Sequence, residues 1–136
     1  MVILKKTVAY ICVGNSCRSQ MAEGFTGKLA GDILDVYSAG THPSKKVNPN
    51  AVKVMKEKDI DISKQYPKHL SEIPKKVDYL ITMGCGVECP YIPNSYRTDW
   101  GLDDPDGKPV EEFRKTRNII EEKVRNLIKM IKAEEI

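Results

Sequence analysis

The chain has 136 residues, of which 40% are hydrophobic and 30% charged, and its formal net charge is +3. This length suits one domain, residues 1–136, with its own core, and so small a charge predicts no nucleic-acid or membrane partner. The apolar run near the N-terminus, roughly seven residues long, is too short for a signal peptide or a membrane span. Four cysteines without such a signal predict a reducing, cytoplasmic location and thiols kept for chemistry.

Strand-like and helix-like segments alternate along the chain. Short runs of β-branched or aromatic residues predict strands at residues 7–13, 34–38, 79–83 and 96–100. Longer runs with apolar residues near helical spacing predict helices at residues 18–30, 49–58 and 110–133, the second capped by Asn48. This alternation predicts an α/β fold, a single domain with a four-stranded parallel sheet flanked by helices on both faces. Ligands of such sheets bind at the carboxyl ends of the strands.

The segment between the first strand and the first helix is the most informative. It reads Cys12-Val13-Gly14-Asn15-Ser16-Cys17-Arg18-Ser19. A strand, a tight loop and a helix N-terminus direct backbone N–H groups and the positive end of a helix dipole at one point, which suits a tetrahedral oxyanion. The planar guanidinium of Arg18 can bind two oxygens of that anion.

The same field favours the thiolate form of Cys12, the candidate nucleophile. Arg18 and the neighbouring Ser19 join it as catalytic candidates. The candidate oxyanion-binding residues are Val13, Gly14, Asn15, Ser16, Cys17 and Arg18. The competing interpretation, an ordinary buried cysteine beside an ordinary turn, leaves the spacing of Arg18 unexplained.

Two later segments also follow predicted strands, which places them at the same edge of the sheet. One carries Cys85 and Cys89, whose spacing over a helical turn lies within disulfide range. The other carries Asp104, a candidate general acid, with Asp103 as the alternative acid. A zinc site made of the four cysteines is disfavoured, because one pair lies inside the anion loop.

The stretch from Cys12 to Gly24 resembles the signature of the low-molecular-weight protein tyrosine phosphatase superfamily, and within it the thioredoxin-coupled arsenate reductases. The resemblance continues at residues 37–41, 61–63 and 103–105. It implies a low-molecular-weight tyrosine phosphatase-like fold and a redox-active disulfide relay of the kind used in arsenical resistance. In that relay Cys12 attacks arsenate, Cys85 attacks Cys12, and Cys89 attacks Cys85. A thioredoxin-like reductant then resets the enzyme. In the alternative, Cys12 and Cys85 are the only active pair and Cys89 is a spare buried thiol.

Two other functions remain open. A low-molecular-weight protein tyrosine phosphatase would hydrolyse phosphate monoesters through a Cys12 phospho-enzyme. However, Asp104-Pro105 is followed by Asp106-Gly107-Lys108, where the phosphatases usually carry an aromatic pair. Cys85 and Cys89 also have no role in ester hydrolysis. The third possibility is an oxyanion-binding or regulatory module.

Cys17 could form a protective disulfide with the nucleophile or merely pack.

Some members of the superfamily bind potassium through residues that match Asn15, Glu23 and Ser38 and through an aspartate after the second helix. That last position falls at Lys68, whose ammonium could replace the cation. We therefore expect no metal, no potassium requirement and no cofactor. The expected partners are arsenate or phosphate and the thioredoxin-like reductant, and the expected state is a monomer.

Overall fold

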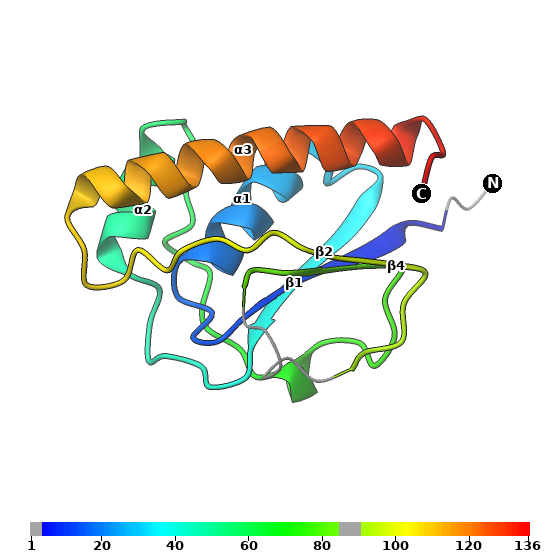
Figure 1. The fold of residues 1–136 in the computed structure, drawn as a ribbon, viewed down its shortest axis with the longest axis horizontal. Coiled ribbons are helices and arrows are strands. Elements are labelled where there is room, and N and C mark those ends of the chain that lie inside the picture. The colour runs from blue at the N-terminus through cyan, green and yellow to red at the C-terminus, as the bar shows by residue number, and fades with distance from the viewer. Residues whose placement is uncertain (1–3, 85–90) are drawn as a thin grey trace.

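The computed structural model describes residues 4–84 and 91–136, which form an α/β domain (Figure 1). Its strands are β1 (Lys6–Cys12), β2 (Leu34–Gly40), β3 (Tyr79–Thr82) and β4 (Tyr96–Asp99). Its helices are α1 (Arg18–Ala30), α2 (Pro49–Lys56), α3 (Val110–Lys132) and the short 3-10 helix η1 (Leu70–Glu72). Within these described residues, no helix is long and apolar enough to cross a membrane.

The sheet has the order β2-β1-β3-β4, and all its strand pairs are parallel. The predicted fold class, an α/β domain on a four-stranded parallel sheet, is therefore confirmed. At the carboxyl end of β1, Cys12 pairs with Gly40 of β2, and Ile11 pairs with Thr82 of β3. The ends of three strands thus meet beside Cys12, at the edge where parallel sheets bind ligands.

The two faces of the sheet are covered unequally. Val8 and Tyr10 of β1 belong to the larger hydrophobic core, which contains residues of α1, α2 and α3. Ala9 and Ile11 point to the other face and pack in a smaller core with loop residues such as Ile73. Figure 1 shows the three α-helices on one side of the sheet and η1 on the other. We expected helices on both faces, and in the part of the chain described here the second face carries only this one-turn helix.

Helix α2 shows why predicted boundaries shift by a residue or two. Asn48 caps it as predicted, because its side chain accepts a hydrogen bond from the N–H of Asn50 at 2.8 Å. The helix ends at Lys56 rather than at residue 58. Asp59 has a left-handed φ of 60°, and its N–H bonds back to the carbonyl of Lys56 at 2.9 Å. Periodicity alone does not reveal this local termination.

The long helix α3 offers a direct test of the core. Ile120 is fully buried, whereas its neighbour Ile119 is 45% exposed. Ile120→Ala should lower the free energy of unfolding by about 2–5 kcal/mol, because it removes packed methyl groups and leaves a cavity. Ile119→Ala should change it by only about 0.5 kcal/mol. Urea denaturation followed by circular dichroism measures both, and equal effects would contradict this assignment of the buried face.

Candidate active site

Residues 13–17 form the loop between Cys12, the last residue of β1, and Arg18, the first residue of α1, and several carbonyl groups of residues 12–16 are turned outward. Four backbone N–H groups of residues 41–48 donate to these carbonyl oxygens at 2.9–3.3 Å. The first turn of α1 has no side-chain cap and no acidic residue. An anion inside the loop would therefore meet N–H donors and the positive end of α1 rather than acceptors. Gly40 permits this close packing, because a Cβ there would collide with the carbonyl oxygen of Val13.

The Cys12 thiol lies at the centre of this loop and is only 2% exposed. Its sulfur accepts a hydrogen bond from the backbone N–H of Asn15 at 3.1 Å. The hydroxyl oxygen of Ser19 lies 2.8 Å from the same sulfur. These two groups can stabilise a thiolate, because a thiolate accepts hydrogen bonds and has no proton to donate.

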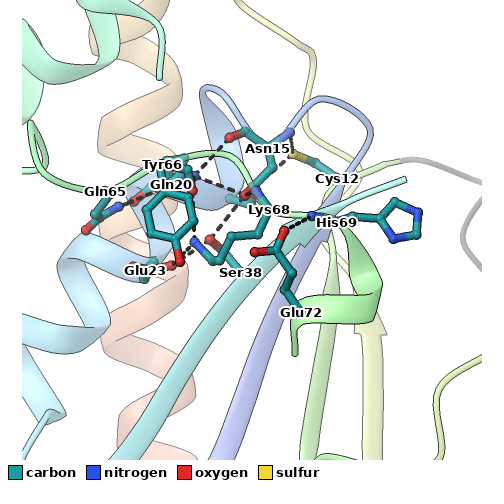
Figure 2. A network of polar contacts seen from close by, with 11 residues as sticks. Cys12, Asn15, Gln20, Glu23, Ser38, Gln65, Tyr66, Lys68, His69 and Glu72 are labelled. Carbon is teal, nitrogen blue, oxygen red and sulfur yellow. Dashed lines mark hydrogen bonds and ion pairs between the residues drawn. The ribbon is translucent and has the colours of Figure 1, made fainter. Parts of the chain in front are cut away.

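Asn15 is fully buried, and all four hydrogen-bonding positions of its side-chain amide are filled. Its oxygen accepts from the backbone N–H of Lys68 at 2.9 Å and from the Gln20 amide at 3.0 Å. Its nitrogen donates to the hydroxyls of Ser19 at 2.7 Å and of Ser38 at 3.0 Å. Asn15 also has a left-handed φ of 50°, a backbone conformation that non-glycine residues rarely adopt. The hydrogen bonds of its side chain help to hold this conformation (Figure 2).

The backbone N–H of Lys68 fixes the direction of the neighbouring hydrogen bonds. A backbone N–H can only donate, so the side-chain oxygen of Asn15 must face Lys68 and its nitrogen must face the serines. The Ser19 oxygen then accepts from Asn15, which leaves its own proton for the thiolate of Cys12. Ser38 accepts from Asn15 in the same way and donates to a carboxylate oxygen of Glu23 at 2.5 Å.

The Lys68 ammonium lies where the sequence led us to expect a positive charge (Figure 2). It stands 3.8 Å from a carboxylate oxygen of Glu23 and donates to the carbonyl of Tyr66 at 2.9 Å. It also lies 4.6 Å from the centre of the Tyr66 ring. The negative charge of Glu23, which accepts from Ser38, is therefore paired with the positive charge of Lys68. Within residues 4–84 and 91–136, no group of three or more His, Cys, Asp or Glu residues is arranged to hold a metal ion.

The guanidinium of Arg18 is nearly buried and is held by backbone carbonyl groups. The side chain is 7% exposed, and one terminal nitrogen donates to the carbonyls of Met83 and Leu102, both at 2.8 Å. Its Nε is buried and has no hydrogen-bond partner among the described residues. A buried guanidinium N–H normally has an acceptor, so this vacant donor beside the Cys12 loop fits an oxyanion.

The candidate acid loop reaches the site through Asp104. A carboxylate oxygen of Asp104 lies 3.6 Å from the second terminal nitrogen of Arg18, and the Asp104 side chain is 53% exposed. Its other oxygen accepts from the N–H of Asp106 at 3.0 Å, which orients the carboxyl group. Between the two predicted acids, Asp104 is the one that pairs with Arg18.

Cys17 differs from Cys12 in its surroundings. It is 2% exposed, and its sulfur lies 3.5 Å from the hydroxyl of Ser16. The pKa of the Cys17 thiol is raised to about 12, chiefly by burial; the hydrogen bond with Ser16 lowers it, and the carboxylates of Asp104 and Asp106 add smaller upward effects. Cys17 is therefore a neutral thiol near pH 7.

Cys85 and Cys89 lie outside the described residues. Met83, two residues before Cys85, lies beside the end of β1, because its N–H donates to the carbonyl of Ile11 at 3.0 Å. The carbonyl of Met83 in turn accepts from Arg18.

Sequence reasoning did not single out Gln20 and Gln65, although both belong to the network around Asn15. Gln20 is fully buried, and its side-chain amide is bonded to the side chain of Gln65 at 2.7 Å. A polar residue in the first turn of a helix usually faces solvent, and no pattern in the sequence marks this one as buried. The sequence also could not predict that the carbonyls of Met83 and Leu102 bind Arg18, because every residue has a backbone carbonyl.

Comparison with known proteins shows the family of this chain. The family model for low molecular weight phosphotyrosine protein phosphatase matches residues 7–136. Arsenate reductase 2 of Staphylococcus saprophyticus is 44% identical over 127 residues, which cover 89% of this chain and 95% of that protein.

Two solved structures are similar over most of this chain. An arsenate reductase in its phosphate-binding state has a TM-score of 0.84 and 40% identity, with 93% of this chain and 98% of that chain covered. A thioredoxin-dependent arsenate reductase of Corynebacterium glutamicum has a TM-score of 0.80 and 31% identity, with 96% of this chain and 63% of that chain covered. The chain belongs to the low molecular weight phosphotyrosine protein phosphatase family.

Proposed function

We propose that this protein reduces arsenate to arsenite through Cys12 and an intramolecular disulfide relay, and that a thioredoxin-like dithiol protein resets the relay. The carrying observation is a buried thiol, Cys12, inside a loop of N–H donors, beside an arginine whose Nε has no partner among the described residues. The chain also contains Cys85 and Cys89, which a reductive relay uses and ester hydrolysis does not. Relatives described as arsenate reductases support this choice.

The first step is nucleophilic. The Cys12 thiolate attacks arsenic, a sulfur–arsenic bond forms, and one arsenate oxygen leaves as water after it is protonated. Arg18 and the loop N–H groups bind the remaining oxygens and stabilise their charge. Asp104 is the proposed proton donor, because its carboxyl group lies against Arg18 and remains half-exposed to solvent.

The second step transfers two electrons to arsenic. The Cys85 thiolate attacks the sulfur of Cys12, the sulfur–arsenic bond breaks, and its electron pair stays on arsenic, which leaves as arsenite. Ser19 donates to Cys12 at 2.8 Å in the resting state and can orient its sulfur for both steps. Cys89 then attacks Cys85 and frees Cys12. Reduction of the Cys85–Cys89 disulfide by the partner dithiol completes the cycle.

The same reasoning extends to the setting of the enzyme. We propose that it acts in the cytoplasm, because the relay needs a reducing compartment that regenerates thiols. We also propose that it acts as a monomer. The ammonium of Lys68 beside Glu23 supports the expectation that no potassium is required.

Phosphate ester hydrolysis is the second candidate, because phosphate has nearly the shape and charge of arsenate. The surroundings of the loop disfavour an aryl substrate. Among the described residues, the hollow beside Ser16 is lined by polar, charged and proline side chains and by no aromatic ring, namely Ser16, Ser44, Lys45, Lys46, Asn48, Pro49 and Asp106. A phenol ring would find no aromatic wall there, so we expect only weak hydrolysis of small aryl phosphates.

Turnover assays with cysteine variants test the proposed function. Wild type should reduce arsenate with thioredoxin, thioredoxin reductase and NADPH. Cys12→Ser should abolish this activity together with p-nitrophenyl phosphate hydrolysis, because both need the nucleophile. Cys85→Ser should abolish only arsenite release, and Cys89→Ser should permit one turnover and leave a Cys12–Cys85 disulfide detectable by mass spectrometry. Strong aryl phosphate hydrolysis without arsenate turnover in wild type would favour the phosphatase instead.

Arg18→Lys tests the role of the guanidinium. Lysine keeps the positive charge but cannot donate to Met83 and Leu102 and also present two N–H groups to an anion. We expect kcat/KM for arsenate to fall at least about 100-fold. Steady-state kinetics and thermal denaturation, measured together, separate this loss from unfolding. Kinetics within a few-fold of wild type would show that charge alone is sufficient.

A further inference from the structure

The only two glutamines of this chain, Gln20 and Gln65, meet next to the nucleophile loop (Figure 2). The side-chain nitrogen of Gln20 lies 2.9 Å from the carbonyl oxygen of Asn15 and 3.0 Å from its side-chain oxygen. The same nitrogen lies 3.0 Å from the carbonyl oxygen of Tyr66. One buried amide therefore joins the loop to residues 65–68.

Gln65 determines which way the Gln20 amide points. Its side-chain nitrogen donates to the side-chain oxygen of Gln20 at 2.7 Å and to the Gln20 carbonyl at 3.0 Å. On its other side Gln20 faces carbonyl oxygens of Asn15 and Tyr66, which can only accept. If the Gln20 amide were reversed, its oxygen would face the carbonyl oxygens of Asn15 and Tyr66, and its nitrogen would face the side-chain nitrogen of Gln65. The pair therefore has one satisfied arrangement.

We propose that Gln65 and Gln20 are positioning residues for the nucleophile: Gln65 orients Gln20, Gln20 holds Asn15, and Asn15 aligns the Ser19 hydroxyl with the sulfur of Cys12. For its effect on turnover this rests on the proposed function, whereas its effect on the Cys12 thiolate does not. Neither glutamine is assigned a contact with the oxyanion.

The contacts around Asn15 explain how this pair acts at a distance. Gln20 donates to both oxygens of Asn15, whose left-handed backbone needs such support. If this donation is lost, Asn15 can shift and the Ser19 hydroxyl leaves its line to Cys12. The thiolate then loses a hydrogen-bond donor, while Arg18 keeps its own partners, the carbonyls of Met83 and Leu102. The rate of reaction at the Cys12 sulfur should therefore fall more than the affinity for the anion.

A matched pair of variants at Gln65 tests the proposal, because this residue is only partly buried and, among the described residues, its side-chain hydrogen bonds go to Gln20 and not to the loop or Cys12. Gln65→Glu has the same size but sets an acceptor against the Gln20 oxygen. Gln65→Lys keeps a donor at that place. Gln20→Met, which removes the whole amide, is the stronger variant.

The first readout needs no substrate. Iodoacetamide alkylation of Cys12 is followed against pH by fragmentation mass spectrometry. Cys17, whose pKa burial raises to about 12, is the internal control that should stay unlabelled near neutral pH. Gln65→Glu and Gln20→Met should slow Cys12 alkylation at pH 7 about tenfold and move its pH profile upward, whereas Gln65→Lys stays within about twofold of wild type.

The second readout separates chemistry from binding. In Gln65→Glu, kcat for arsenate should fall about tenfold, while the dissociation constant of inorganic phosphate changes by less than about twofold. Equal alkylation in all Gln65 variants would overturn the proposal, as would a Gln65→Lys variant as slow as Gln65→Glu. A loss of phosphate binding in step with kcat would also overturn it, because that result indicates a collapsed loop. If wild type alkylates as expected but does not reduce arsenate, the proposed function fails and the positioning role stands.

Discussion

The site depends on one buried amide, the side chain of Asn15. Its four hydrogen-bonding positions are filled by four different residues, and its backbone has a φ of 50°. An unpaired polar group costs free energy when it is buried, so each of these contacts holds the others in place. Because one of the partners is Ser19 and the backbone N–H of Asn15 itself reaches Cys12, the geometry of the sulfur is set by this amide.

The fold supplies these partners from segments that are distant along the chain. The strand order places Ser38 at the end of β2 beside β1, and the carbonyl of Lys68 accepts from the N–H of Gly40 at 2.8 Å. The segment after α2 is thereby attached to the end of β2, which brings the N–H of Lys68 to Asn15. The carboxyl edge of the parallel sheet thus carries the proposed oxyanion site and also assembles the polar groups around Cys12, the proposed nucleophile.

Much of this arrangement could be predicted from the sequence, because strong local patterns specify it. The run from Cys12 to Ser19 combines strand, loop and helix start, and the structure joins Cys12 to Ser19 and Arg18 to Asp104. The 3-10 helix η1 was missed, because three residues carry no periodicity. Gln20 and Gln65 were missed for a different reason. Their importance comes from a tertiary contact between residues 45 apart, which no local pattern encodes.

Arg18 indicates how one scaffold serves both ester hydrolysis and oxyanion reduction. A single nitrogen of its guanidinium bonds to Met83, at the start of the segment that leads to Cys85, and to Leu102, at the start of the acid loop. Arg18, the proposed anion clamp, is therefore bonded to the residues that precede both candidate chemical segments, while its Nε has no acceptor in the described part of the chain. The first nucleophilic step is common to both reactions. We propose that the fate of the covalent adduct depends on whether water or the thiol of Cys85 reaches it, so that the residues after β3, rather than the proposed anion loop, decide the reaction.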